Sequence, residues 1–459
     1  MSIEQKVDNV EIKRYPKKIL TSFQLGAMIS LMTSPLFSIQ LRYYYQDVVG
    51  LEATYFMLAM NIFTIFNMFN DPVVGYLCDR STKLTNKWGK RFPFIVMGAF
   101  PMALLILFIF IPPSVNQVGQ WGVFWWLLIS FIFRDTALAI YSINRNALLP
   151  DKFRHQEDRN YMGFLALILE TFGLILGFGI PVLAVAFLGD QEGFFLSGIL
   201  ITALCIILFI FMIPGVREGP ELRARRSILD EKERVGFFSG MKEILKNRNF
   251  IAMTSLSIAY STSMSLIMTS IPYFVRDLLQ MEALGEFIFI FYVVGIFIMS
   301  PVWLRLSSKI GIRRIALIGG LCLGFVFIPI LFMPEGPEGF PLAIIVLIIW
   351  GLIDGSIISM MAPLNSAMID DATIKSGKRQ EGLYGSVGVF FGTWVTSITY
   401  TLTWIITTIF GTALIGLRIQ MAIFPIIVML IGVLLFWKLY IITPDEMKEN
   451  TVKLKERNL

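Results

Sequence analysis

Residues 61–91 read NIFTIFNMFNDPVVGYLCDRSTKLTNKWGKR. The stretch begins as an apolar helix that carries three asparagines and Asp71, and it ends in a loop rich in lysine and arginine. An ionisable side chain inside a membrane helix costs a few kcal/mol and normally faces a protein interior or a water-filled path. Asp71 is therefore either a functional carboxylate or a group that caps, or pairs with, the neighbouring basic loop.

The composition is that of a membrane protein. Of 459 residues, 56% are hydrophobic and 16% are charged, whereas about a quarter of the residues in soluble domains are charged. The formal net charge is +6, but the basic residues lie in short loops between apolar runs, where they orient a membrane protein. We therefore exclude nucleic acid as a partner and expect the lipid bilayer as the surroundings.

Apolar runs long enough to cross a bilayer recur along the whole chain. A spanning helix needs about 20 mainly apolar residues, and in lipid the backbone must satisfy its own hydrogen bonds. The sequence predicts an all-α integral membrane protein with twelve transmembrane helices. They are expected at about 19–45, 52–78, 92–112, 121–149, 160–188, 194–215, 249–276, 284–309, 313–333, 340–369, 382–410 and 415–442.

Loop charges predict the orientation, since cytoplasmic loops are enriched in lysine and arginine. The loops after helices two, four, eight and ten are basic, and the opposite loops are poor in lysine. We therefore expect a plasma-membrane protein with both termini in the cytoplasm. The predicted parts are a cytoplasmic tail (1–18), a six-helix bundle (19–216), a cytoplasmic loop (217–248), a second six-helix bundle (249–443) and a second tail (444–459).

The two halves of the chain share spaced motifs. The heptapeptide at 47–53, DVVGLEA, corresponds to DLLQMEA at 277–283, at a shift of 230 residues. In the fourth and tenth predicted helices, Asp135, Asn146 and Asp151 correspond to Asp354, Asn365 and Asp370 at a shift of 219. Such repeats are typical of transporters, in which two related bundles rock about a shared site near the bilayer centre.

Charged side chains gather on the fourth predicted helix. Arg134 and Arg145 are eleven residues apart, about three turns, which puts them on one face. Adjacent helical residues point about 100° apart, so a local salt bridge does not account for both Arg134 and Asp135. Asp135 and Asp354 either contribute to a substrate site or gate, facing each other across a central cavity, or belong to a charge network that holds the bundle together.

The fifth predicted helix carries a further carboxylate, Glu170, followed by Gly173 and Gly177. Glycines allow membrane helices to approach closely. We expect Glu170 to pair with Arg134 or Arg145 in preference to direct contact with a substrate.

Three motifs resemble a known family. The sequence from Gly75 through Asp79-Arg80 to Trp88-Gly89-Lys90-Arg91 resembles the loop after the second helix of the major facilitator superfamily. Within it, Asn70-Asp71-Pro72 followed by Trp88-Gly89-Lys90 is similar to the glycoside-pentoside-hexuronide:cation symporters, the family of melibiose permease. The segments YYYQDVVG at 43–50 and DD at 370–371 with SGKRQEG at 376–382 add to this resemblance, which covers essentially the whole chain.

The resemblance implies a major facilitator fold of two pseudo-symmetric six-helix bundles, and it implies roles for particular residues. It gives a cation site to Asp71, with Asn67 and Asn70 as neighbours. It gives a cytoplasmic gating motif to Gly75, Asp79, Arg80, Gly89, Lys90, Arg91, Asp370, Lys378, Arg379 and Glu381.

The chain also departs from the family pattern. Melibiose-type members carry two carboxylates a turn apart on the second helix, and here the first of them falls on Asn67. One carboxylate makes a weaker sodium site than two. Acidic residues that contact sugar in such members fall on Leu31 and Ser142, and a lysine on helix eleven falls on Thr393. A galactoside is therefore not assumed as the substrate.

These observations predict a secondary transporter that moves a sugar or glycoside-like solute by alternating access, coupled to Na⁺ or H⁺. The expected substrate or gating residues are Arg134, Asp135, Ser142, Arg145, Glu170, Asp354 and Thr393. The alternatives are a transporter of lysolipid or another amphiphile, and a non-transporting membrane sensor. No nucleophile, base and orienting group occur together in a long loop, so we expect no enzyme activity. We expect no cofactor or metal beyond Na⁺, and a monomer.

Overall fold

The computed structural model describes residues 14–80, 88–153, 155–219, 241–242, 244–281, 283–376, 381–410, 414–443, 446–447, 449–450 and 453. Over these residues the chain is helical and contains no strand. The chain divides into two compact units, Met1–Arg234 and Val235–Leu459.

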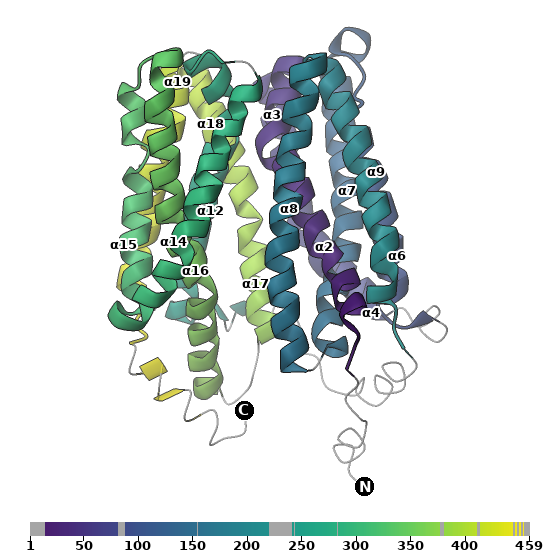
Figure 1. Cartoon of the computed structure of the whole chain (residues 1–459), viewed down its shortest axis with the longest axis vertical. Coiled ribbons are helices and arrows are strands. Elements are labelled where there is room, and N and C mark those ends of the chain that lie inside the picture. Colours follow the sequence, from purple (N-terminus) through teal and green to yellow (C-terminus); the bar gives the residue numbers. More distant parts are fainter. Residues whose placement is uncertain are drawn as a thin grey trace. The chain divides into compact units, whose positions relative to one another are not determined.

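The N-terminal unit is built from long helices that follow one another with short connections (Figure 1). The first is composite, since α-helical and π-helical pieces alternate along it without a break. The elements are α2 (Lys17–Pro35), η1 (Leu36–Gln40), α3 (Leu41–Tyr43), η2 (Tyr44–Val48), α4 (Ala53–Arg80), α6 (Phe92–Ile109), α7 (Val115–Lys152), α8 (Gln156–Leu188) and α9 (Asp190–Val216).

The C-terminal unit has more interruptions. Its elements are α12 (Arg248–Met268), α13 (Ile271–Tyr273), η3 (Phe274–Leu278), η4 (Ala283–Ile288), α14 (Phe289–Ile310), α15 (Ile312–Phe325), η5 (Ile328–Phe332), η6 (Pro337–Gly339), α16 (Phe340–Ser376), α17 (Glu381–Gly392), α18 (Trp394–Phe410), α19 (Leu414–Arg418), η7 (Ile419–Ile423) and α20 (Phe424–Leu439). The predicted eleventh helix, 382–410, is thus split in two, with Thr393 at the break.

Eleven of the described helical segments are long and apolar enough to span a membrane. The 28-residue helix α4 falls outside this set because Asn61, Asn67, Asn70 and Asp71 lower its hydropathy. Its length is sufficient for a crossing, since 28 residues rise about 42 Å and the hydrocarbon core is about 30 Å thick. Counting α4, the described part of the chain has the predicted twelve transmembrane helices.

Helix packing follows the same scheme in both units. In the N-terminal unit α2 packs against α8 and α9, α7 packs against α4 and α6, and α6 also packs against α9 (Figure 1). In the C-terminal unit α12 packs against α18 and α20, α16 packs against α14 and α15, and α15 also packs against α20. Helices at equivalent positions therefore have equivalent neighbours, which confirms the two pseudo-symmetric bundles.

The repeat at a shift of 230 extends to the backbone. The π-helical segment Tyr44–Val48 and the π-helical segment Phe274–Leu278 are related by that shift. The N–H of Val49 donates to the carbonyl of Tyr44 over 2.9 Å, and the N–H of Leu279 donates to that of Phe274 over 3.0 Å. A π-helical turn inserts one residue into an α-helix. Both units therefore carry the same insertion in their first helix.

Each inserted turn ends in a residue with a left-handed backbone. Gly50 has φ +84°, and Gln280, 230 residues later, has φ +50°. Gln280 is the non-glycine residue with positive φ among those that the structure describes. The left-handed conformation costs a side-chain-bearing residue about 1–2 kcal/mol, which glycine avoids. The C-terminal unit thus keeps a strained copy of a turn that the N-terminal unit makes with glycine.

Two glycines on α8 explain its close contact with α2. A β-carbon at Gly173 would lie 2.3 Å from the carbonyl oxygen of Met28, and one at Gly177 would lie 1.9 Å from that of Met32. No side chain fits at these positions, so the glycines permit the helix–helix approach that the sequence predicts.

Candidate functional site

The N-terminal unit contains a buried charge cluster between α4 and α7. Arg134 and Asp135, near the middle of α7, are both buried, with relative exposures of 8% and 9%. Although adjacent residues point in different directions, Nη1 of Arg134 lies 4.0 Å from Oδ1 of Asp135. This separation is at the outer limit of an ion pair, and each residue has a further neighbour, Phe37 for Arg134 and Asp71 for Asp135.

The polar residues of α4 lie on the other side of Asp135. Its carboxylate interacts electrostatically with Asp71 and lies beside the amide of Asn70. Oδ1 of Asn70 accepts a hydrogen bond from the hydroxyl of Thr136 over 3.1 Å. Oδ1 of Asn67 is buried without a hydrogen-bond partner among the described residues. Of the three α4 residues of the predicted cation site, Asn70 and Asp71 thus lie next to Thr136 and Asp135, which that prediction did not include.

Both arginines of α7 lie over phenylalanine rings of the first helix. The guanidinium of Arg134 is 4.1 Å from the ring centre of Phe37, and that of Arg145 is 4.8 Å from that of Phe23. The two arginines therefore share one face of α7, as their spacing predicts. A cation over an aromatic face contributes about 0.5–2 kcal/mol, more where water is excluded.

Arg145 is fixed by α2. It donates to the carbonyl oxygen of Phe23 over 3.3 Å and to Oε1 of Gln24 over 3.1 Å. A β-carbon at Gly26 would lie 2.3 Å from Nε of Arg145, so this glycine makes room for the guanidinium. The half-buried carboxylate of Glu170 on α8 acts electrostatically on Arg145. Of the two predicted partners of Glu170, the structure therefore places Arg145 near it.

In the C-terminal unit, Asp354 is fully buried, with 0% exposure. The hydroxyl of Tyr292 donates to its Oδ2 over 2.8 Å, and Tyr260 interacts with the same carboxylate. Tyr292 stacks on Trp350 with 3.8 Å between ring centres. Asp354 and Asp135 occupy equivalent positions in the repeat, but their surroundings differ. Asp354 lies among tyrosines of α12 and α14, whereas Asp135 lies among charged residues. The predicted role of Asp354 in substrate binding or gating remains a prediction.

The loop of the predicted gating motif is fastened by a residue from the end of α9. Glu218, only 1% exposed, accepts hydrogen bonds from the backbone N–H groups of Arg91 and Phe92, over 2.5 and 3.0 Å, at the start of α6. Gly89, with φ +96°, makes space for this carboxylate, since a β-carbon there would lie 2.7 Å from its Cδ. The side chain of Arg91 donates to Asn144 over 3.2 Å.

The structure describes only some of the other residues of the predicted gating motif. Gly75 lies in α4, where a β-carbon would meet no atom within 4 Å, and Asp370 and Lys90 are half-buried. Lys378 and Arg379 lie outside the described residues. The side chains of Asp79, Arg80 and Glu381 are not described.

Lys152, at the end of α7, is a buried cation that the sequence analysis did not single out. Its Nζ donates to the carbonyl oxygens of Gly215 over 2.5 Å and Arg217 over 2.9 Å, at the end of α9. Burial lowers the pKa of this lysine to about 8, and the negative charge of Glu218 partly opposes the shift. Lys152 and Glu218 together join the ends of α6, α7 and α9.

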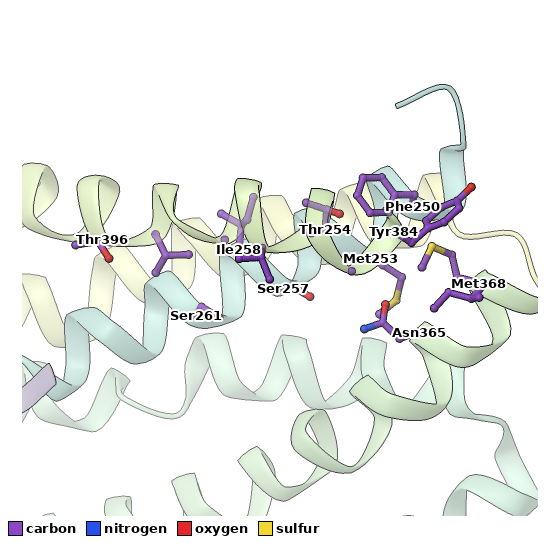
Figure 2. Close-up of a pocket in the computed structure, with 16 residues that line it drawn as sticks. Phe250, Met253, Thr254, Ser257, Ile258, Ser261, Asn365, Met368, Tyr384 and Thr396 are labelled. Atoms are coloured by element: carbon purple, nitrogen blue, oxygen red, sulfur yellow. The ribbon is translucent and has the colours of Figure 1, made fainter. Parts of the chain in front are cut away.

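A cavity of about 480 Å³ lies within the C-terminal unit (Figure 2). Helix α12 lines it with Thr254, Ser257 and Ser261, and α16 contributes Asn365 and Met368. Three glycines of α17 form the facing wall. They are Gly385, Gly388 and Gly392.

The predicted site residues Ser142 and Thr393 are half-buried. Thr393 lies at the α17–α18 break, between the cavity residues Gly392 and Val395, and its hydroxyl donates to the carbonyl oxygen of Phe390 over 2.7 Å. Sequence reasoning came close to the cavity at Thr393 but missed its lining. The sequence signals for this lining were hydroxyl-bearing residues spaced three and four positions apart on α12 and glycines with the same spacing on α17.

Similar proteins are transporters. The chain is 21% identical over 376 residues to the isoprimeverose transporter of Lactiplantibacillus pentosus, covering 80% of this chain and 75% of the relative. It is 24% identical to the uncharacterized symporter YjmB of Bacillus subtilis, with 97% and 96% covered. It is 20% identical to the mouse sodium-dependent lysophosphatidylcholine symporter 1, with 68% and 64% covered.

The fold is shared with solved transporters. The crystal structure of the nucleoside transporter NupG superposes with a TM-score of 0.61 at 14% identity, covering 96% of this chain and 100% of that one. The family model described as MFS/sugar transport protein matches residues 22–443. With twelve helices in two repeated bundles and buried charges inside them, the chain belongs to the MFS/sugar transport protein family.

Proposed function

We propose that the protein is a cation-coupled secondary transporter that moves a sugar or glycoside-like solute across the plasma membrane by alternating access. The family and the repeated bundles support transport. The isoprimeverose transporter supports a sugar, and the relatives named as symporters support coupling to an ion. We further propose that the protein is a monomer with both termini in the cytoplasm, in line with the basic loops.

The observation that carries the proposal is the charge balance of the cluster between α4 and α7. Asp135 interacts electrostatically with Asp71 and with a single arginine, Arg134. With both carboxylates ionised the cluster has a net charge of −1. An uncompensated charge inside a membrane protein is costly, so binding of one cation or one proton is favoured.

The donor set suits a hard cation. Na⁺, like other hard cations, is held by oxygen atoms, and the cluster offers two carboxylates, the unpartnered Oδ1 of Asn67 and the hydroxyl of Thr136. No described residue donates a hydrogen bond to Asp71, so its oxygens are available. A proton on Asp71 or Asp135 would neutralise the same charge, and the gradient experiment distinguishes the two ions.

The test is uptake of isoprimeverose into proteoliposomes under an imposed sodium or proton gradient. One of the two gradients should drive accumulation above the external concentration. Asp71→Asn and Asp135→Asn should abolish accumulation and retain equilibrative exchange, because they remove the cluster's net charge. The control Asp190→Asn, whose carboxylate accepts a hydrogen bond from Tyr43 near the start of α9, should accumulate like the wild type. Equilibration without accumulation under either gradient would refute coupling.

A second candidate substrate is a lysolipid. The cation–aromatic pair of Arg145 and Phe23, beside apolar residues of α2, suits a phosphate head group attached to an acyl chain. The mouse relative is named for lysophosphatidylcholine. Uptake of lysophosphatidylcholine with isoprimeverose inert, together with its loss in Arg145→Gln, would favour this candidate over a sugar.

A further inference from the structure

Arginines from two other helices bind the last turn of α20. Nη2 of Arg313, at the start of α15, donates to the carbonyl oxygen of Trp437 over 2.8 Å. Nε and Nη2 of Arg248, at the start of α12, donate to those of Leu439 and Lys438 over 3.2 and 3.1 Å. The final carbonyl groups of a helix have no partner within it, so the two arginines complete the hydrogen bonding of α20. They also bring positive charge from α12 and α15 to the end of α20.

Two further cations lie beside these capping arginines. Arg314 is in the first turn of α15, and Lys438 is in the last turn of α20. Both side chains are exposed, and neither forms a hydrogen bond or an ion pair with a residue that the structure describes. The carboxylate of Asp371, on the neighbouring helix α16, pairs with Lys375 over 2.7 Å. The described part of the chain therefore does not neutralise Arg314 and Lys438.

Each of these two cations ends a stripe of exposed apolar side chains. On α15, the residues that follow Arg314 at intervals of four, three and four are all exposed and apolar. They are Ile318, Leu321 and Phe325. Residues with this spacing lie on one face of a helix.

The stripe on α20 has the same spacing in the opposite chain direction. The residues that precede Lys438 at intervals of four, three and four are again exposed and apolar. They are Leu434, Ile431 and Ile427. Each helix thus presents a face that is apolar along its length and positively charged at its end.

The charged ends of the two stripes lie at the same end of the helix pair. Helices α15 and α20 pack against each other, and a β-carbon at Gly320 would lie 2.7 Å from Cγ2 of Val433. Since Arg313 bonds to Trp437, the chain rises along α15 as it falls along α20, and the helices are antiparallel. Each stripe covers eleven residues, which rise about 16 Å, close to the thickness of one leaflet of a hydrocarbon core of about 30 Å.

This combination of charge and length suits one class of molecule. In a bilayer the exposed apolar stripes contact acyl chains, so the cations at their ends lie at the level of the lipid phosphate groups. Trp437, exposed beside Lys438, is a residue typical of that level. A basic loop that only orients the protein needs no apolar stripe of matching length, and a soluble anion would complement the charge but not the stripes.

We propose that the paired ends of α15 and α20 bind an anionic phospholipid, with its phosphate group on Arg314 and Lys438 and its acyl chains along the two stripes. Basic pockets between membrane helices bind such head groups. The proposal is independent of the transported solute. With the proposed orientation the site faces the cytoplasmic leaflet, whose surface is negatively charged.

The test is a lipid titration of the purified full-length protein in a non-ionic detergent, with bound lipid counted by native mass spectrometry. Dioleoylphosphatidylglycerol is the anionic probe, and dioleoylphosphatidylcholine is the zwitterionic probe with the same acyl chains. The anionic lipid should bind with the lower Kd. Arg314→Gln and Lys438→Gln should each raise that Kd roughly 5-fold, which corresponds to about 1 kcal/mol per cation, and the double variant should raise it roughly 25-fold. The Kd of the zwitterionic lipid should not change.

A matched control removes one exposed cation that has no apolar stripe. Lys18→Gln does so at the start of α2, where the residues at the same intervals, Ser22, Leu25 and Ile29, are buried or half-buried. This variant should bind dioleoylphosphatidylglycerol like the wild type. The substitutions at Arg314 and Lys438 keep the hydrogen bonds of the capping arginines, so their unfolding temperatures without added lipid should equal that of the wild type.

A soluble anion, sn-glycerol 3-phosphate, separates a lipid site from a plain anion site. It should not displace dioleoylphosphatidylglycerol at equal concentration, because it lacks the acyl chains that the stripes contact. Displacement at equal concentration would overturn the proposal, as would equal affinity for the two phospholipids or wild-type binding by the double variant. A Kd raised as much by Lys18→Gln as by Lys438→Gln would also overturn it, since binding would then depend on net charge alone.

Discussion

At the scale of one residue, the burial of Lys152 makes the stability of the protein depend on pH. Its folded pKa of about 8 lies below the ordinary 10.5, so between these values the folded chain has released a proton that the unfolded chain retains. Stability from this group therefore rises with pH across that window. Lys152→Met should lower the unfolding temperature, because the carbonyl oxygens of Gly215 and Arg217 lose their donor.

The deficit of Lys152→Met should widen as the pH is raised from 7 to 9, since the wild type gains stability that the variant lacks. Thermal unfolding of both proteins in detergent at several pH values measures this difference. A deficit that stays constant or shrinks as the pH rises would show that burial does not lower the pKa of Lys152.

The buried charges on α7 could be identified from the sequence, because a guanidinium or a carboxylate stands out in an apolar run. The partners of these charges could not be identified from the sequence. Phe37 and Phe23 look like ordinary core residues, and only the fold brings them under Arg134 and Arg145. Glu218 was similarly hidden, since it lies 127 positions from Arg91, to which it bonds.

At the scale of the helix, the strained turn at Gln280 makes a direct prediction. Gln280→Gly should stabilise the protein by about 1 kcal/mol, because glycine adopts the positive φ of this position without steric strain. Gly50→Ala, at the equivalent turn of the N-terminal unit, should destabilise it by a similar amount. Thermal unfolding measures both, and a stabilised Gly50→Ala would contradict the argument.

The packing of α8 on α2 provides a second helix-scale prediction. Gly177→Ala should destabilise the protein by roughly 1–3 kcal/mol, because the β-carbon would meet the carbonyl oxygen of Met32 and force the helices apart. Gly163→Ala, in the same helix with open space around it, should be neutral or stabilising by up to about 1 kcal/mol. Equal unfolding temperatures for the two variants would refute the steric explanation.

Hydropathy predicted the helices but not their irregularities. The predicted first helix, 19–45, contains the π-helical turn Leu36–Gln40 and ends inside a second one, Tyr44–Val48, and the predicted eleventh is interrupted at Thr393. An inserted π-helical turn leaves the apolar run intact, so the composition of the run does not reveal the turn. Polar residues have the opposite effect, since those of the candidate cation site make α4 less apolar than an ordinary membrane span.

For the whole molecule, the loop charges predict which side of the membrane each end faces. In a background with Cys78, Cys205 and Cys322 replaced by serine, Asn116→Cys should react with an impermeant maleimide on intact cells. Lys309→Cys, at the end of α14, should react only after permeabilisation. Both positions are exposed in the structure. The reverse pattern would invert the proposed topology.

The twofold organisation was the most predictable property of the molecule, because spaced motifs such as those at 47–53 and 277–283 survive in both halves. The cavity was less predictable. Serine, threonine and glycine are common in membrane helices as packing residues, and their spacing gains meaning only when α12 and α17 are seen to face each other.

The matched π-helical turns also bear on ancestry. An identical insertion at the same offset in both halves is most simply explained by a single event in an ancestral six-helix chain, before its gene was duplicated and fused. Gly50 then represents the residue suited to that ancestral turn, and Gln280 a later replacement that one copy tolerated. Reconstructed ancestral halves should accordingly encode glycine at both positions.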